Sequence, residues 1–412
     1  MDVVLGIDLG TSGVRIAATD RAGALVSMSA AALGPVPDAT RWWQATSEAL
    51  RQLDLARLTV HAIAVDGTSG TILPVTAAGT PCGPASMYND VAAAACVARV
   101  AAAAPPETAA LGVTSPLARA IPMQETAARI LHQADWIAGQ FSGRFDVSDE
   151  NNALKSGYDP VLRRWPEWIA NTGFDLALFP QVVPAGTRTA TIRKDVADFF
   201  GLPRDVAIVA GTTDGCAAFL ASGAALAGDG VTSLGTTLTL KLLSDRPVFA
   251  PHYGIYSHRI GDQWLAGGAS NSGGAVLGQF FSPADIARLT LLLDPDRPAG
   301  LDYYPLPKPG ERFPINDPAF APRLAPRPAD DRLFFQAILE GIAGIEAQGY
   351  RRLAELGATR LGTIRTAGGG AANAAWTTIR LKALGVPHRP SRSEHAAVGT
   401  ARLAWRGLGH AD

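Results

Sequence analysis

The chain has 412 residues, of which 47% are apolar and 18% charged, a composition typical of a soluble globular protein with two domains. A formal net charge of −1 without a long basic block argues against partners such as nucleic acid or a membrane surface. We expect a cytoplasmic protein for three reasons. The three cysteines lack zinc-site spacing, the N-terminus runs directly into a strand pattern, and the apolar runs are shorter than a membrane span.

The first half of the chain predicts strands separated by glycine-rich turns. Apolar and β-branched runs predict strands over residues 3–7, 14–19, 24–31, 62–65 and 72–75. Helices are predicted over residues 42–53, over the alanine-rich stretch 91–104, and over 124–141. The last of these shows apolar residues at helical spacing and has Gly143 just beyond its end.

The second half repeats this opening pattern after a small-residue stretch at residues 222–229, which we interpret as a hinge. Its patterns predict strands over 230–234, 238–243 and 363–366, and helices over 333–356, 372–384 and 394–405. The proline-rich segment 295–328 is expected to be an irregular surface connection. Because a strand-turn-strand unit opens each half, we expect an α/β fold of two similar domains with a ligand-binding cleft between them.

The first candidate site lies in a glycine-framed turn directly after the first strand. Asp8 is followed there by Gly10, Thr11 and Ser12. Glycine lets the main chain approach a phosphate closely, and the two hydroxyls can donate to phosphate oxygens. Asp8 could bind hydrated Mg²⁺, which prefers one or two carboxylates together with water and phosphate oxygens. An ordinary hairpin turn, in which the aspartate caps its own backbone, explains the same residues equally well.

A second aspartate, Asp214, ends a similar strand-turn pattern half a chain later. A carboxylate at a strand end can orient a sugar hydroxyl that attacks a γ-phosphate, and can accept its proton late in the reaction. The alternative is a helix N-cap, because the apolar run Cys216–Leu220 follows. Together the two aspartates suggest phosphoryl transfer between the two halves of one molecule.

Two turns in the second half are candidates for holding a nucleotide, since the chain contains neither a P-loop nor a dinucleotide-binding glycine motif. Gly235, Thr236 and Thr237 repeat the hydroxyl-glycine pattern, although a simple hairpin is the alternative. Gly368, Gly369 and Gly370 follow a predicted strand and leave a flat slot for a base or ribose, with Asn373 as a purine contact. A tight strand-to-helix turn is the alternative for this segment.

Two further polar turns carry the short hydroxyl, amide and carboxylate groups that a polyol site needs. They are Asp66–Thr71 and Tyr88–Asp90, and each is equally explained as a surface turn. The seven histidines show no metal-ligand spacing, and we assign them no role.

As a set, these segments resemble the FGGY carbohydrate kinases, which share the actin-like (ribonuclease H-like) ATPase fold. The resemblance rests on six blocks in the order of the family: residues 7–12, 132–139, 211–215, 233–237, 339–343 and 368–373. It implies ATP and Mg²⁺ as cofactors and a small-molecule sugar as substrate. It also implies Asp214 as catalytic base, Asp8 as metal and substrate contact, and Thr11 and Ser12 as phosphate contacts.

The resemblance assigns residues 1–221 to a sugar-binding domain and 222–393 to a nucleotide-binding domain. Residues 394–412 form a C-terminal helix that could pack back on the first domain, and the protein is expected to be a monomer or a homodimer. The frequent Trp-x-Asp-x-Arg sugar motif of the family appears here as Tyr88–Ala92, without its tryptophan and arginine.

The compact chain looks most like the short ribulose kinases of cyanobacteria and plastids. This resemblance favours D-ribulose as the substrate, which would be phosphorylated to D-ribulose 5-phosphate. Asp8, Ser69 and Asp214 are then expected around the sugar hydroxyls. D-xylulose or another polyol is the alternative substrate. A sensor or chaperone-like ATPase of the same fold, or a sugar-binding protein without turnover, is the alternative of another class.

Overall fold

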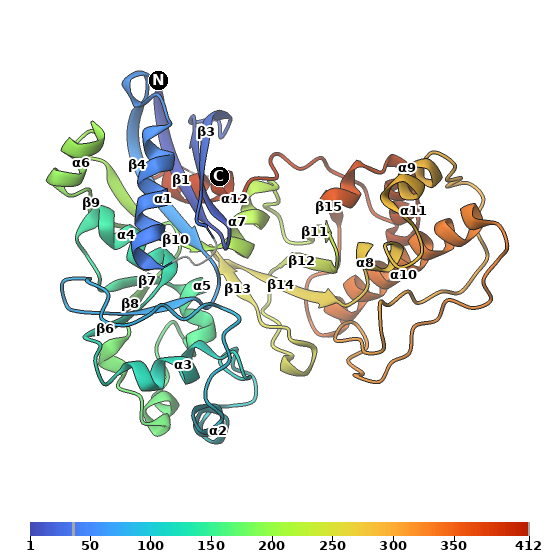
Figure 1. Ribbon diagram of the computed structural model, residues 1–412, viewed down its shortest axis with the longest axis horizontal. Coiled ribbons are helices and arrows are strands. Elements are labelled where there is room, and N and C mark those ends of the chain that lie inside the picture. Colours follow the sequence, from blue (N-terminus) through green and yellow to red (C-terminus); the bar gives the residue numbers. More distant parts are fainter. Residues whose placement is uncertain (35–37, 411–412) are drawn as a thin grey trace. The chain divides into compact units, whose positions relative to one another are not determined.

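The computed structural model describes residues 1–34 and 38–410, so the last two residues of the predicted 394–412 segment lie outside the described part. The chain divides into two compact units. Unit 1 comprises Met1–Ala221, His258–Gly261 and His395–Asp412, and unit 2 comprises Ser222–Ser257 and Asp262–Glu394 (Figure 1).

Unit 1 is built on a six-stranded sheet with the order β3-β2-β1-β4-β10-β9. Its central strands β1, β4 and β10 are parallel neighbours, whereas the pairs that involve β2 or β9 are antiparallel. The strands are β1 (Asp2–Leu9), β2 (Gly13–Thr19), β3 (Leu25–Ala32), β4 (Thr59–Gly67), β9 (Arg188–Thr191) and β10 (Ala207–Thr213).

Helices cover both faces of this sheet (Figure 1). On β1, Val3 packs with Trp42 of α1, whereas the next residue, Val4, packs with residues of α12. Helix α12 approaches β1 so closely that a Cβ at Gly6 would lie 2.0 Å from the carbonyl oxygen of Ala397, so this position requires glycine. The covering helices are α1 (Ala39–Arg51), α4 (Gln133–Ser142), α7 (Asp214–Ala221) and α12 (Ala396–Gly407).

The predicted helix over residues 124–141 is wrong in its first half. Strand β6 (Arg129–His132) pairs with β5 (Ile72–Val75), and α4 begins only at Gln133. The apolar pair Ile130–Leu131 fits either periodicity, and pairing with β5 decides the outcome. His132 and Asp135 then form a capping box that starts the helix.

Unit 1 has further elements besides its six-stranded sheet, the four covering helices and the antiparallel pair of β5 and β6. They are α2 (Ala94–Ala103), α3 (Pro116–Met123), β7 (Val147–Asp149), α5 (Glu150–Ala153), β8 (Gln181–Val183), α6 (Lys194–Phe200) and β13 (His258–Ile260). Strands β7 and β8 pair in parallel.

The strands of unit 2 lie in one sheet in the order β14-β12-β11-β15. Here β11 pairs antiparallel with β12 and parallel with β15, as β1 pairs with β2 and β4 in unit 1. This repeated arrangement confirms the predicted α/β class with two similar domains. The strands are β11 (Asp229–Leu234), β12 (Leu238–Ser244), β14 (Gln263–Ser270) and β15 (Thr363–Ala367).

Four helices complete unit 2: α8 (Gly274–Leu277), α9 (Pro283–Thr290), α10 (Asp331–Glu355) and α11 (Ala374–Leu384). The fully described segment 295–328 forms only isolated bridges, as its proline content predicts. Within the described part of the chain, no helix is long and apolar enough to cross a membrane.

Candidate active site

Three carboxylates meet where the parallel strands of unit 1 end. In the register of β1 and β4, Asp8 stands opposite Asp66, and in that of β4 and β10, Asp66 stands opposite Thr212. Asp214 begins α7 directly after β10. Because the carboxyl ends of parallel neighbours lie at one sheet edge, three segments far apart in sequence deliver their aspartates together.

A shift of register in β10 precedes Asp214 and helps to set the direction of its side chain. The pairing with β4 is interrupted between Val209 and Thr212. A Cβ at Gly211 would lie 1.7 Å from the carbonyl oxygen of Val65, so only glycine lets the two strands approach here.

Asp66 is the most deeply buried of the three carboxylates. Its side chain has no exposure, and its Oδ2 accepts a hydrogen bond from Thr400 of α12, whereas Oδ1 has no partner among the described residues. Burial, reinforced by the charge of Asp8, raises the pKa of Asp66 well above its ordinary value. The alternative interpretation of residues 66–71 as a surface turn is therefore wrong, because all six residues except the half-buried Ser69 are buried.

Asp8 is also largely buried, with 7% exposure. Burial raises the pKa of its carboxyl group, and the charge of Asp214 acts in the same direction. Arg15 partly compensates the negative charge of these carboxylates, because its Nη1 lies 3.7 Å from Asp8 Oδ2. Thr11 and Ser12, predicted as phosphate contacts, are exposed in the β1–β2 turn, which is closed by a 3.0 Å hydrogen bond from Gly10 N to Gly13 O.

Asp214 is half-buried and is the first residue of α7. Its Oδ1 accepts a 2.6 Å hydrogen bond from Gly215 N. The positive end of the helix dipole stabilises a negative charge at this position. The carboxylate is thus held by its own helix while part of the side chain stays accessible.

Unit 2 brings together the two turns that were predicted to bind a nucleotide. Ser233 of β11 stands opposite Ala367 of β15, so Gly235–Thr237 and Gly368–Gly370 follow adjacent strand ends. Gly368 has a φ of +83°, and a Cβ there would lie 2.7 Å from the carbonyl oxygen of Leu234. At Gly369, in contrast, a Cβ would meet no other described group within 4 Å, so this residue borders open space.

Asn373 has a structural task in addition to its predicted contact with a purine. It is the N-cap of α11, where its Oδ1 accepts a 2.9 Å hydrogen bond from Trp376 N. Its Nδ2 lies 3.4 Å from Thr290 Oγ1, a long contact that leaves this amide group weakly engaged.

A buried ion pair behind these turns was missed by sequence reasoning. Arg380 of α11 donates to both carboxylate oxygens of Glu346 of α10, each at 2.6 Å, and also to Thr366 of β15 at 2.9 Å. Thr232 of β11 donates to the same glutamate. The network joins two helices to the two strands that end in the turns predicted to bind a nucleotide. A charged pair on two apolar helices is the signal that could have revealed it.

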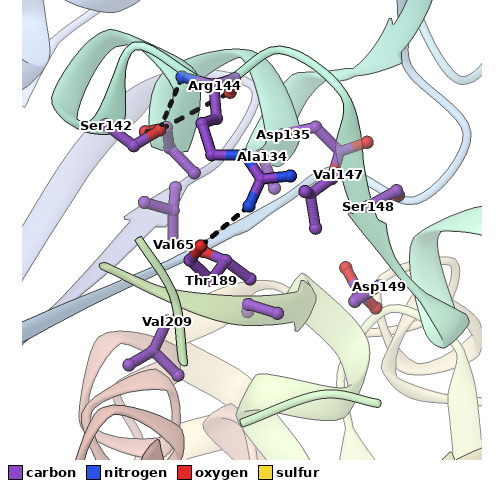
Figure 2. A pocket seen from close by; sticks show the side chains of 13 residues that line it. Val65, Ala134, Asp135, Ser142, Arg144, Val147, Ser148, Asp149, Thr189 and Val209 are labelled. Carbon is purple, nitrogen blue, oxygen red and sulfur yellow. Dashed lines mark hydrogen bonds between the residues drawn. The ribbon is translucent and has the colours of Figure 1, made fainter. Parts of the chain in front are cut away.

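A small cavity of unit 1 is lined by none of the three aspartates. Figure 2 shows it between α4, β7 and β10, with Arg144 reaching Thr189 across it and Asp149 at its edge. Its volume of about 30 Å³ suffices for a buried water but not for a sugar. A larger hollow of about 520 Å³ in unit 2 is lined by α10 and α11 residues such as Tyr350 and Leu384, again away from the glycine turns.

Residues 230–408 match the description "FGGY family of carbohydrate kinases, C-terminal domain". The whole chain is also similar to the L-fuculokinase of Salmonella typhi, with 26% identity over 99% of this chain and 93% of that protein. Residues 230–408 thus carry the C-terminal domain of the FGGY carbohydrate kinases. Because this domain and the named relatives are those of sugar kinases, the chain is a phosphotransferase that acts on a sugar hydroxyl, and such kinases use ATP.

Other kinases show how far the similarity extends. A xylulose kinase of Streptomyces coelicolor is 29% identical over 59% of this chain, which spans only 55% of that relative. Among solved structures, a "xyloylose kinase" from Brucella ovis superposes with a TM-score of 0.87 at 23% identity, covering 100% of this chain and 91% of that one. A glycerol kinase from Plasmodium falciparum superposes with a TM-score of 0.84 at 14% identity, covering 100% of this chain and 90% of that one. These structures establish the two-domain actin-like fold.

Proposed function

We propose that this sugar kinase phosphorylates a ketopentose and that Asp214 is its catalytic base. The observation that carries the proposal is the meeting of Asp8, Asp66 and Asp214 at one sheet edge, where Asp214 alone of the three is half-exposed. Asp66 is buried and engaged by Thr400, so it cannot serve as the base in this arrangement. Asp214 is the carboxylate that a substrate hydroxyl can reach.

Asp214 would orient the attacking hydroxyl and accept its proton late, because phosphoryl transfer passes through a loose transition state. The hydrogen bond from Gly215 N fixes one carboxylate oxygen. In this proposal Asp8 and Ser69 also contact the sugar. The hydroxyl of Ser69 is buried and has no partner within the described residues, so it is available to a ligand.

The nucleotide would bind to unit 2, at Gly235, Thr236 and Thr237 and at the triple-glycine turn that Asn373 follows. The exposed main chain of Gly369, with open space beside it, supports a slot for the base or ribose. Residues 1–221 would then form the sugar-binding domain and 222–393 the nucleotide-binding domain, with Thr11 and Ser12 as further phosphate contacts.

Asp8 is the proposed Mg²⁺ ligand. Three carboxylates crowd together here and Arg15, 3.7 Å from Asp8, compensates their charge only in part, so the donor set suits a divalent cation. The described residues contain no cluster of three His, Cys, Asp or Glu side chains in metal-binding geometry, and Mg²⁺ needs only one or two carboxylates beside water and phosphate. When bound, Mg²⁺ neutralises charge on the polyphosphate.

Two ketopentoses are the leading candidates. The short polar turn Asp66–Ser69 supports D-ribulose through the resemblance of the sequence to short ribulose kinases. The xylulose kinases among the relatives support D-xylulose comparably. We retain D-ribulose as the first candidate and D-xylulose as the second.

A sugar panel tests this proposal. Purified protein is incubated with Mg-ATP and, separately, D-ribulose, D-xylulose, L-fuculose and glycerol, and both ADP release and the phosphorylated product are measured. We expect ADP release to be fastest with D-ribulose and to yield D-ribulose 5-phosphate. Faster turnover of D-xylulose would replace the first candidate by the second, and a panel in which no ketopentose stimulates ADP release would refute the ketopentose assignment.

A further inference from the structure

Helix α3 places one guanidinium group among the segments that carry the polyol-type side chains of unit 1. Arg119 is only 5% exposed. Its Nη1 donates to the carbonyl oxygens of Ser86 and Met87, at 3.0 and 2.9 Å, and to Ser86 Oγ at 2.7 Å. Its Nη2 donates to the carbonyl oxygen of Gly70. One side chain thus joins the turn after β4 to the segment after β5, although 15 residues, including strand β5, separate Gly70 from Ser86 in sequence.

The buried charge of Arg119 has no ion-pair partner among the described residues. Its link to a carboxylate is indirect, because Ser86 Oγ donates to Asp90 Oδ2 at 3.1 Å. Burial lowers the pKa of Arg119 to about 10, and the charge of Asp90 acts in the opposite direction. The group therefore stays charged at neutral pH. A buried cation held mainly by carbonyl oxygens is costly, and a well-packed apolar side chain would serve helix packing better.

The segments that Arg119 joins carry groups suited to hydroxyl recognition. Ser69, next to Gly70, has a buried hydroxyl without a partner in the described part of the chain. Thr71 Oγ1 accepts a 3.1 Å hydrogen bond from Tyr88 N and contacts Thr68 Oγ1 at 2.6 Å. Asp90 Oδ2 also accepts from Met87 N at 2.8 Å, which fixes the carboxylate on the exposed side of the same segment. These contacts make one connected polar layer with Arg119 beneath it.

We propose that Arg119 is a positioning residue of the sugar site, which holds the Gly70 turn and the Ser86–Asp90 segment in the geometry that binds the sugar hydroxyls. The inference rests on the proposed function, because it takes Ser69 to be a sugar contact. Arg119 itself need not touch the substrate. Its loss should weaken sugar binding while ATP binding, which is assigned to unit 2, stays unchanged.

The test compares Arg119→Met, Arg119→Lys and Ser86→Ala with the control Ile121→Val. Methionine keeps the length of the side chain and removes the donors, lysine keeps the charge, and Ser86→Ala cuts the link to Asp90. Ile121 lies in the same helix and is 4% exposed, so its shortening loosens α3 by about 1 kcal/mol without touching the polar layer. The readouts are kcat, KM for sugar, KM for ATP, and amide hydrogen exchange of peptides covering 69–72 and 86–90.

We expect Arg119→Met to raise the KM for sugar by about tenfold or more, with the KM for ATP changed less than about twofold. Arg119→Lys should recover part of this loss, Ser86→Ala should show a smaller increase, and Ile121→Val should leave both KM values unchanged. An unchanged KM for sugar in Arg119→Met, or equal changes in both KM values, would overturn the proposal.

Hydrogen exchange separates this outcome from a failure of the proposed function. Faster exchange in both peptides of Arg119→Met, but not of Ile121→Val, supports the positioning role even if the wild type turned over none of the tested sugars. Unchanged exchange in those peptides would overturn it whatever the activity of the wild type.

Discussion

Asp66 and Asp214 both lie at the ends of neighbouring parallel strands, yet their surroundings give them different chemistry. Asp66 is enclosed between β1, β10 and α12, and burial raises the pKa of its carboxyl group well above the ordinary value. Asp214 begins a helix whose N-terminus stabilises its negative charge, and it remains half-exposed. Position in the fold, more than residue type, separates a structural carboxyl group from a candidate base.

Asp149 provides a residue-scale test of how burial acts on a carboxyl group. It is 2% exposed, and burial, with the charge of Asp135, raises its pKa to about 7. The folded state therefore holds a proton that the unfolded chain loses near pH 4, so this group makes stability fall as pH rises from about 4 to about 7. Asp149→Asn should flatten that part of the profile, because the amide Oδ1 can still accept from Asn151 N and Asn152 N.

Urea unfolding at pH 5, 6, 7 and 8 measures this effect. The control is Asp146→Asn. The hydrogen bond from Arg144 lowers the pKa of Asp146, so loss of this carboxyl group should not flatten the stability profile between pH 4 and pH 7. Parallel stability profiles for the wild type and Asp149→Asn would contradict the assignment.

At the scale of elements, α12 contributes to the edge of unit 1 that carries the candidate active site. Thr400 on this helix donates to Asp66, and the neighbouring Gly399 packs against α7, the helix that Asp214 begins. A Cβ at Gly399 would lie 1.9 Å from the carbonyl oxygen of Ala217. The two helices can therefore approach only because residue 399 is glycine.

Gly399→Ala should destabilise the protein by about 1–3 kcal/mol, since the methyl group forces the two backbones apart. Gly344→Ala is the matched control, because Gly344 is also inside a helix, α10, and no atom of the described residues would crowd its Cβ within 4 Å. There alanine should stabilise the helix by up to about 1 kcal/mol. Both changes are measured by urea unfolding, and equal effects of the two substitutions would contradict the packing described for α12.

The triple-glycine turn allows a similar test of nucleotide binding. Gly369 has open space at its Cβ position, so Gly369→Ala should leave the melting temperature unchanged while the methyl group enters the proposed nucleotide slot. We expect the Kd for ATP to rise by about tenfold, and the KM for sugar to stay constant. Calorimetric titration with ATP checks this, with Gly357→Asn at an exposed helix end of unit 2 as control. Unchanged ATP affinity would remove Gly369 from the site.

At the scale of the whole molecule, the sequence predicted local features better than distant contacts. Each strand-end aspartate and glycine turn could be found because a short apolar run and the residues after it are contiguous in sequence. The meeting of Asp8 with Asp66 depends on strand register, and the bond from Thr400 spans 334 positions, so neither follows from local periodicity. The short β6 strand was misassigned because Ile130 and Leu131 fit both helix and strand patterns.

The duplicated architecture explains why the two halves look alike in sequence and differ in their proposed tasks. In both units a hairpin is followed by a parallel strand, and the turns at the strand ends carry the candidate groups. Unit 1 places carboxylates there, whereas unit 2 places glycines and threonines. Carboxylates suit a hydroxyl and a metal ion, and side-chain-free turns suit a nucleotide.

The most direct measurement is sugar-dependent ADP release by the wild type, Asp214→Ala and the control Asp205→Ala. Asp205 is exposed at the opposite end of β10, so its removal should leave turnover unchanged. Loss of a positioned base should lower kcat of Asp214→Ala by roughly 10²–10⁴-fold while the Kd for ATP, measured by calorimetry, is retained. Turnover of Asp214→Ala equal to that of the wild type would contradict the assignment of Asp214 as the base.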